Sequence, residues 1–486
     1  MEIGCVYSAD DFADKLPNFS SIPFGISSVA AALKHAGHDP RLLVVTPPTN
    51  ISDLIGGYIQ EHNPRLMCLT AVSTQYPKIC AIAKMIKEIS PSTAVILGGH
   101  HATLNPEESI KFPPFDAICI GEGERAVVEY AAGIQKDERP GGINNLWIKT
   151  GRDPVEKNPQ DPFIQDLDSL PPIDMRLWDE WIQDKTALAS VLVGRGCPNR
   201  CAYCSNHALA RVAKGKYVRF RSVESVVEEI GRLIELYPDL SRVFLEMETF
   251  SVKLDYTFKM CEALEKFNAN RDKPIFFGAN LAVTRQLGNN HELMKWFKRA
   301  NFNFFNIGLE SGSEKVRNEI LRRPAYTNQE FLDFCRLAKS YGITFNLFAL
   351  LGIPGETVDD FQETIKIIRL SEPQNVLLSI FYPYPGTDLH ARVKQMGIWT
   401  DDLPDPSMER SRALMDLPGF PKKRIQREFL LFPYKAYKGK KSLAIIAAMM
   451  ATRYISISPI LKPIYMKALT NNYFNALRNR FSTSKS

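Results

Sequence analysis

The sequence predicts an α/β protein with two parallel-sheet units, a doubly wound N-terminal domain and a partial (β/α)6 barrel, followed by a mostly helical C-terminal segment. Two observations support this class. Apolar runs of strand length alternate with helical patterns in two series, and a stretch rich in proline and glycine separates the series. The alternation stops near residue 400. We therefore place the boundaries at 1–140, 141–182, 183–400 and 401–486.

The first series predicts a sheet that helices cover on both faces. Its strand candidates are Ile3–Tyr7, Leu42–Val45, Leu66–Val72, Thr93–Leu97 and Ala117–Ile120, and its helix candidates are Phe24–His35, Ile51–Gln60 and Lys78–Ile89. Strands that are apolar throughout are typical of parallel sheets buried on both sides. Right-handed crossovers between such strands give a doubly wound, Rossmann-like domain.

The second series follows a polar stretch, residues 141–182, that we interpret as a linker with little regular structure. Its strand candidates are Leu188–Val193, Val243–Met247, Ile275–Ala279, Phe304–Leu309, Phe345–Leu350 and Val376–Phe381. Its helix candidates are Val223–Tyr237, Tyr256–Phe267, His291–Arg299, Gln329–Tyr341 and Val358–Leu370. Six strands are two short of a full eightfold barrel. We therefore expect an open side through which a large substrate can enter.

The cysteines and the N-terminus indicate a cytoplasmic protein. Nine cysteines are an odd number, and six of them are scattered in apolar segments as expected of free thiols. Met1–Ser8 has the pattern of a strand and not of a signal peptide. The longest apolar run, Leu443–Ala451, has nine residues, whereas a membrane-spanning helix needs about 20.

The other three cysteines form a compact motif after the first barrel strand. Cys197, Cys201 and Cys204 have the spacing CxxxCxxC, at the end of a strand where α/β barrels place catalytic residues. Three thiolates can hold three irons of a 4Fe–4S cluster and leave the fourth iron open. A structural zinc site completed by His207 is the alternative interpretation.

This motif, with an aromatic residue before its last cysteine and a six-unit α/β series behind it, resembles the radical S-adenosylmethionine superfamily. The resemblance covers roughly Ala187–Arg392. It implies that the three cysteines bind a 4Fe–4S cluster, which cleaves S-adenosylmethionine into a 5′-deoxyadenosyl radical. It also implies that Tyr203 packs near the adenine; packing in the core is the alternative for this side chain.

Later strand ends match the same superfamily. By the resemblance, a carboxylate after the second strand receives the methionine amino group. Glu246 and Glu248 lie on one face of that strand, and we favour Glu248 because it is nearer the end. The resemblance assigns the ribose contact to Glu310 with Ser311, and backbone contacts to adenine at Gly352. Glycine permits such close approach.

The N-terminal domain resembles the cobalamin-binding domain of cobalamin-dependent radical enzymes. Its ligand crevice is expected at the carboxyl ends of the strands. The residues expected there are Ser73, Thr74, Gly98, Gly99, His100, Thr103, Glu122 and Gly123. The Asp-x-His-x-x-Gly motif that supplies a cobalt-binding histidine elsewhere is absent, which leaves the lower face of the cobalt without an assigned ligand. The alternative is a domain that binds no cobalamin and only shapes the site.

Together the resemblances imply a methyltransferase that transfers a methyl group from cobalamin to an unactivated carbon of a small-molecule substrate. A non-methylating radical cyclase or oxidoreductase of tetrapyrrole or natural-product biosynthesis is one alternative. A non-catalytic zinc- or cobalamin-binding protein is another. A tRNA methylthiotransferase is disfavoured, because the N-terminal cysteines lie within predicted strands and a helix, and the C-terminal segment lacks the pattern of a small RNA-binding barrel.

The net charge of +6 is concentrated in the tail. From Phe429 to Ser486 the chain has ten basic residues and no acidic one. A basic amphipathic tail predicts either peripheral contact with an anionic membrane, which would suit a hydrophobic substrate, or a helical cap over the open barrel. No motif indicates nucleic-acid binding. The resemblance implies an electron donor such as flavodoxin or ferredoxin.

Overall fold

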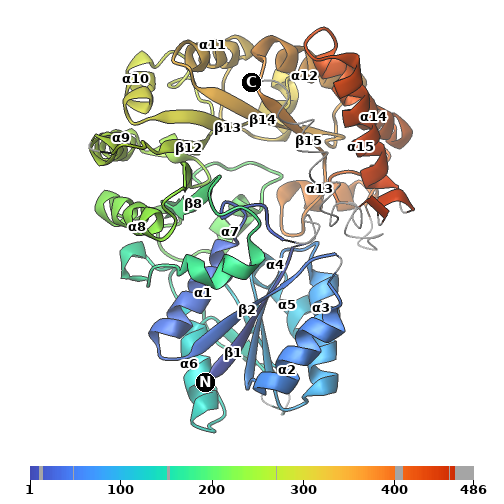
Figure 1. Ribbon diagram of the computed structural model, residues 1–486. Coiled ribbons are helices and arrows are strands. Elements are labelled where there is room, and N and C mark those ends of the chain that lie inside the picture. Colours follow the sequence, from blue (N-terminus) through green and yellow to red (C-terminus); the bar gives the residue numbers. More distant parts are fainter. Residues whose placement is uncertain are drawn as a thin grey trace.

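The computed structural model describes residues 1–9, 15–47, 49–149, 151, 154–269, 271–399, 409–458, 460–462 and 464–465. Two sheets, one per predicted unit, lie with their helices around a shared interface (Figure 1). The basic residues Lys467, Arg478, Arg480 and Lys485 of the tail, and residues 401–408, lie outside the described residues.

The N-terminal domain is the predicted doubly wound sheet. Its parallel strands are β1 (Glu2–Ser8), β2 (Asp39–Val45), β3 (Leu66–Thr70), β4 (Ala94–Gly98) and β5 (Ala117–Cys119), in the order β2-β1-β3-β4-β5. Its α-helices are α1 (Phe24–His35), α2 (Gly57–His62), α3 (Tyr76–Ile89), α4 (His100–Leu104), α5 (Pro106–Lys111) and α6 (Glu124–Gln135). The strand order reverses between β1 and β3, so a ligand crevice is expected beyond their carboxyl ends.

The segment predicted as an irregular linker contributes to this sheet. Strand β6 (Leu146–Ile148) pairs antiparallel with β5, and β7 (Glu156–Lys157) pairs antiparallel with β6. Leu146 and Ile148 are buried, and they anchor the edge of the sheet. These strands have only three and two residues, which is too short for a periodic pattern to stand out from the surrounding prolines and glycines.

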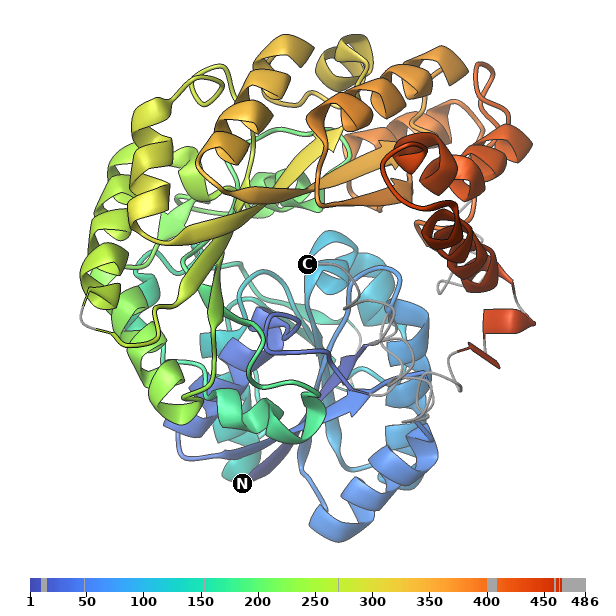
Figure 2. The ribbon, with the colours of Figure 1, turned by 45° about the horizontal axis from the view of Figure 1, so that its top comes forward.

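The second unit is an open, wholly parallel sheet, as the six-strand pattern predicts. Its strands are β8 (Ala189–Leu192), β11 (Arg242–Glu246), β12 (Phe276–Leu281), β13 (Phe302–Glu310), β14 (Thr344–Leu351) and β15 (Asn375–Ile380), in sequence order across the sheet. Its helices are α8 (Val223–Leu236), α9 (Leu254–Asn268), α10 (His291–Arg299), α11 (Asn328–Ser340) and α12 (Val358–Ser371). Figure 2 shows these strands as an arc with the helices on its outer side and the N-terminal domain on its open side.

A short hairpin and a helix follow the first barrel strand. Strand β9 (Gly194–Arg195) pairs antiparallel with β10 (Arg219–Phe220), and α7 (Ser205–Val212) lies between them in the sequence. This hairpin carries the predicted cysteine loop toward the N-terminal domain.

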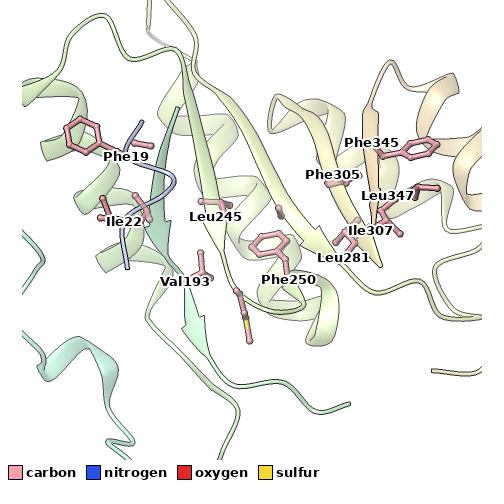
Figure 3. Packing of buried hydrophobic residues seen from close by; sticks show 14 of the residues in the cluster. Phe19, Ile22, Val193, Leu245, Phe250, Leu281, Phe305, Ile307, Phe345 and Leu347 are labelled. Atoms are coloured by element: carbon pink, nitrogen blue, oxygen red, sulfur yellow. The ribbon is translucent and has the colours of Figure 1, made fainter. Parts of the chain in front are cut away.

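The N-terminal domain covers the free edge of the barrel sheet. Phe19, from the loop between β1 and α1, forms a parallel bridge with Ala189 of β8, and Leu16 forms one with Ile182. Phe19 is fully buried, and Figure 3 shows it with Ile22 beside the first barrel strand. A single cluster of buried apolar side chains therefore includes residues of both units.

The described C-terminal residues are mostly helical, as predicted. Helix α13 (Asp388–Gln395) precedes α14 (Lys422–Tyr437), which packs against α12 and β15, and α15 (Leu443–Ile457) packs against α14. Helix α14 thus caps one end of the barrel arc (Figure 1). In α15 only Ile446 is buried. Among the described helices, none combines the length and the apolar composition needed to cross a bilayer.

Candidate active site between the two sheets

A cavity of about 420 Å³ lies where the carboxyl ends of the two sheets face each other. The N-terminal domain contributes the turns after β4 and β5 to its wall, and the barrel contributes the ends of β8 and β11 with the β9–β10 hairpin. Of the predicted cobalamin contacts, Gly98, Gly99, His100, Thr103, Glu122 and Gly123 line the cavity. Ser73 and Thr74 do not line it; they lie on the turn before α3.

Two glycine turns form the floor of this cavity on the N-terminal side. Gly99 has φ +93°, and a Cβ added there would lie 2.7 Å from the carbonyl oxygen of Ala71. Gly121 has φ +86°. The Thr103 hydroxyl donates to the Gly99 carbonyl at 3.0 Å and accepts from the Gly121 amide at 3.0 Å, which ties the turns together. Gly98, Gly99, Gly121 and Gly123 of these turns all line the cavity, and we call them the glycine cradle.

The cysteine loop lies on the barrel side of the cavity. Gly196, with φ +89°, starts the loop; a Cβ there would lie 2.3 Å from the Tyr217 carbonyl oxygen. Burial is the main cause that raises the pKa of all three thiols, to about 12 for Cys204, and the thiols of Cys201 and Cys204 are also affected by the charge of neighbouring cysteines. Thiols gathered in an apolar loop are poor as free acids but well placed as ligands, because metal binding displaces the proton.

The side chains do not form the predicted zinc alternative. His207 Nε2 lies 3.8 Å from Asp388 Oδ2. In the part of the chain that the structure describes, no three His, Cys, Asp or Glu side chains converge on one point as ligands of a single ion do. Cysteines that bind a cubane each ligate a different iron, so they need no common point.

Both candidate carboxylates of the second barrel strand line the cavity. Asn280 donates to Glu246 Oε1 at 3.2 Å. Burial, together with the charge of Glu248, raises the pKa of Glu246 to about 7. Across the cavity, burial lowers the pKa of His100, and the charge of Glu248 opposes that effect. The carboxylate of Glu246 is thus engaged by Asn280, whereas Glu248 is exposed in the cavity wall.

The turn after β13 brings together Glu310, Tyr203 and the cysteine loop. Glu310 has φ +60°, which is rare for a residue other than glycine, and it sits at an irregularity of the β13–β14 register. Arg323 is the side chain that joins these parts. Its Nη1 lies 3.9 Å from Glu310 Oε1, 3.3 Å from the Tyr203 hydroxyl and 4.0 Å from Cys201 Sγ. Ser311 is fully buried behind the turn, where its hydroxyl contacts Thr364.

The turn after β14 is held by a buried carboxylate. Gly352 has φ +75° and donates its amide to Glu356 Oε2 at 2.6 Å, and Ile353 donates to the same oxygen at 3.1 Å. A Cβ on Gly352 would meet Ile425 of α14 at 3.1 Å. Burial raises the pKa of Glu356 to about 8.

The structure thus brings the predicted residues into two groups. Six of the eight cobalamin candidates line one cavity together with Glu246 and Glu248. Tyr203 and Glu310 contact Arg323 beside the cysteine loop, and Ser311 lies on the same turn as Glu310. Three arginines of this region were not predicted from the sequence: Arg323, which contacts Glu310, and the interdomain arginines Arg195 and Arg219. No motif distinguishes them from ordinary surface arginines, since only their burial shows that they act between elements.

Comparison with known proteins agrees with this arrangement. The family model of the radical SAM superfamily matches residues 191–368, and that of the B12 binding domain matches residues 17–131. An uncharacterized methyltransferase of Pyrococcus horikoshii is 27% identical over 371 residues, which are 76% of this chain and 77% of that protein. The anaerobic magnesium-protoporphyrin IX monomethyl ester cyclase of Rubrivivax gelatinosus is 25% identical over 378 residues, 76% of this chain and 65% of the cyclase.

A solved structure has the same fold over most of the chain. The radical S-adenosylmethionine methyltransferase TsrM from Kitasatospora setae, with cobalamin and a [4Fe-4S] cluster bound, superposes with a TM-score of 0.64 at 17% identity and covers 81% of this chain and 75% of that one. The family models identify residues 191–368 as a radical SAM domain and residues 17–131 as a B12 binding domain. On that ground the chain is a radical S-adenosylmethionine enzyme with a B12 binding domain before the radical domain.

Proposed function

We propose that the protein is a methyltransferase that uses a 4Fe–4S cluster, S-adenosylmethionine and cobalamin to methylate an unactivated carbon of a small molecule. The observation that carries this proposal is one cavity that both the glycine cradle and the β9–β10 hairpin line, with Glu248 in its wall. When bound, these cofactors supply an electron, a 5′-deoxyadenosyl radical and a methyl group. The chain's part is to hold them close together and away from water.

The cysteine loop is suited to bind the cluster, and the side chains around Arg323 are suited to bind S-adenosylmethionine. Cys197, Cys201 and Cys204 are the ligands we assign to three irons. Glu248 is assigned to the methionine ammonium, because a charged carboxylate in a cavity pairs well with a cation. Glu310 is assigned to the ribose hydroxyls, with Arg323 holding its carboxylate in place. Tyr203 and the Gly352 turn remain the proposed neighbours of the adenine.

The glycine cradle fits cobalamin. Gly98, Gly99, Gly121 and Gly123 all line the cavity, and at Gly99 a side chain would clash with backbone. A corrin ring needs such bare backbone over a wide area. His100 lies in the cavity wall, where the surrounding protein atoms lower its pKa by desolvation, so we expect its imidazole to be neutral.

Anaerobic reconstitution with iron, sulfide and cobalamin tests the proposal. The wild type should show broad iron–sulfur absorbance, bind cobalamin, and form 5′-deoxyadenosine with a reductant. Replacing Cys197, Cys201 and Cys204 by Ala should abolish both the absorbance and 5′-deoxyadenosine. Cys80→Ser is the matched control, because Cys80 is a half-buried thiol on α3 away from the site. Continued formation of 5′-deoxyadenosine by the triple variant would overturn the assignment.

A radical cyclase is the second candidate, and the 25% identity to the Rubrivivax gelatinosus cyclase favours it. The mass of the product separates the two functions. A gain of one methylene unit identifies methylation, whereas loss of hydrogen or gain of oxygen identifies oxidative ring formation.

We also propose that the protein takes electrons from a flavodoxin or ferredoxin and contacts an anionic membrane through α15. The membrane proposal rests on exposed apolar side chains, among them Leu443, 68% exposed, and Tyr454, 58% exposed. Lys438, Lys440 and Lys441 precede this helix, and basic residues at the edge of an apolar face favour anionic lipid.

A further inference from the structure

A buried cluster of charged side chains joins the glycine cradle to the β9–β10 hairpin, which carries the cysteine loop. Arg195 of β9 donates from Nη1 to Glu122 Oε1 at 2.9 Å and from Nη2 to Glu124 Oε1 at 2.6 Å. The same Nη2 lies 3.1 Å from the Ser28 hydroxyl of α1. Side-chain exposure is 17% for Arg195, 12% for Glu122 and 4% for Glu124. One arginine of the radical domain is thus enclosed by groups from two elements of the B12 binding domain.

A second arginine strengthens the same junction. Arg219 of β10 donates from Nη1 to Glu122 Oε2 at 2.9 Å and to the Ile164 carbonyl at 2.7 Å. The Ile164 amide donates to Glu122 Oε2 at 2.6 Å. Both oxygens of Glu122 are therefore occupied by the hairpin and the linker. This arrangement gives Glu122 a structural task in addition to its place in the cavity wall.

The charges in this cluster balance one another. Burial opposes ionisation of Glu124, but the charge and hydrogen bond of Arg195 outweigh burial and lower the pKa of Glu124 overall. Burial likewise opposes the charge of Arg195, and its two carboxylate partners raise the pKa of its guanidinium overall. Two arginines face two glutamates, so the formal charges of the cluster cancel.

The position of the cluster in the chain links it to both cofactor sites. Arg195 is separated from Cys197 only by Gly196, whose backbone is packed against Tyr217. Glu122 and Glu124 flank Gly123 in the turn that lines the cradle. Loss of the hydrogen bonds from the Arg195 guanidinium to Glu122 and Glu124 would shift the cysteine loop relative to the glycine cradle. Displacements of about 1 Å between reacting groups can reduce rates by roughly 100-fold.

We propose that Arg195 is a positioning residue that fixes the cysteine loop over the cobalamin cradle, so that the substrate radical forms within reach of the methyl donor. The proposal rests on the proposed methyltransferase function. Lysine at this position keeps the charge but has no planar fork to bridge two carboxylates and a hydroxyl. Loss of the planar guanidinium should therefore make methyl transfer less efficient per 5′-deoxyadenosine formed, while both steps still occur.

Arg195→Lys tests this idea with Arg221→Lys as the matched control. Arg221 is also largely buried, at 11% exposure; its guanidinium binds Glu229 at 2.6 Å and the Leu192 carbonyl at 3.0 Å, and its Nε lies 3.7 Å from Asp168, so none of these partners lies in residues 1–140. In Arg195→Lys, methylated product per 5′-deoxyadenosine should fall roughly 10- to 100-fold. The ratio in Arg221→Lys should stay at the wild-type value. An unchanged ratio in a folded Arg195→Lys protein would overturn the proposal.

Hydrogen–deuterium exchange of the cofactor-free protein gives a readout that does not require methylation. Arg195→Lys, and the milder Glu124→Gln if the lysine variant fails to fold, should speed exchange in residues 121–124 and 196–204 together. Arg221→Lys should leave residues 121–124 unchanged. Faster exchange in only one of these two segments, or in neither, would contradict a role of Arg195 in coupling them. If the wild type makes no methylated product, the exchange result still decides whether the cluster couples the two sites.

Discussion

Arg323 joins several of the groups proposed to bind S-adenosylmethionine. Its Nη2 donates to the Gly308 carbonyl and its Nη1 reaches Tyr203 and Glu310. We expect Arg323→Lys to raise the KM for S-adenosylmethionine about tenfold or more, because lysine cannot make these contacts at once. Arg322→Lys is the control, since the neighbouring Arg322 is 46% exposed and pairs with Asp388. Equal KM values for the two variants would contradict the assignment.

The buried carboxyl group of Glu356 should make the stability of the folded protein depend on pH. Its pKa is about 8 in the folded protein, raised by burial, and about 4.3 in an unfolded chain. The folded state therefore binds the extra proton between these values, and Glu356 reduces stability as the pH rises from about 4.3 to about 8. Glu356→Gln, which is neutral throughout, should melt progressively higher than wild type toward pH 8. A difference in melting temperature that does not change with pH would contradict this.

At the residue scale, the sequence offers candidate ligands but not the side chains that support them. The cysteine spacing and the Glu310 turn are local patterns, so they are visible in the chain. Arg195, Arg219 and Arg323 act on residues 71 to 122 positions away in the sequence or across a turn. A contact of that kind depends on the tertiary fold, and a single sequence carries no local sign of it.

At the scale of elements, the glycine cradle should be sensitive to one methyl group. Gly99→Ala combines a positive φ with a clash against Ala71, so we expect cobalamin affinity to fall by at least about tenfold, corresponding to about 1.4 kcal/mol. Gly142→Ala is the control, because Gly142 has φ +68° but open space around its Cα. Titration of cobalamin followed by absorbance measures both. Equal affinities would mean that the turn is not part of the cradle.

Regular elements were predictable to within a few residues, and irregular ones were not. Each of the six barrel strands lies where an apolar run predicts it. Strands β6 and β7, the β9–β10 hairpin and the bridge at Phe19 were missed. Their pairing partners lie far away in the sequence, and pairing rather than local composition makes them strands.

At the scale of the whole molecule, the exposed face of α15 predicts binding to anionic vesicles. We expect cosedimentation with liposomes that contain anionic lipid, and weaker binding at high salt because screening reduces the attraction. Leu443→Ser combined with Ile445→Ser should reduce binding, since these side chains are 68% and 46% exposed. Leu236→Ser, at a 48% exposed site on α8, is the control. Equal binding by both variants would remove the membrane proposal.

The bridge between Phe19 and Ala189 also has a consequence for biosynthesis. The ribosome releases the N-terminal domain before β8, so the loop that carries Phe19 can already be in place when the first barrel strand emerges. That strand then finds a partner for its outer edge, which would otherwise be open to other nascent chains. Separate expression of the radical domain should therefore yield aggregated protein, and the order of the two domains in the chain is itself a safeguard during translation.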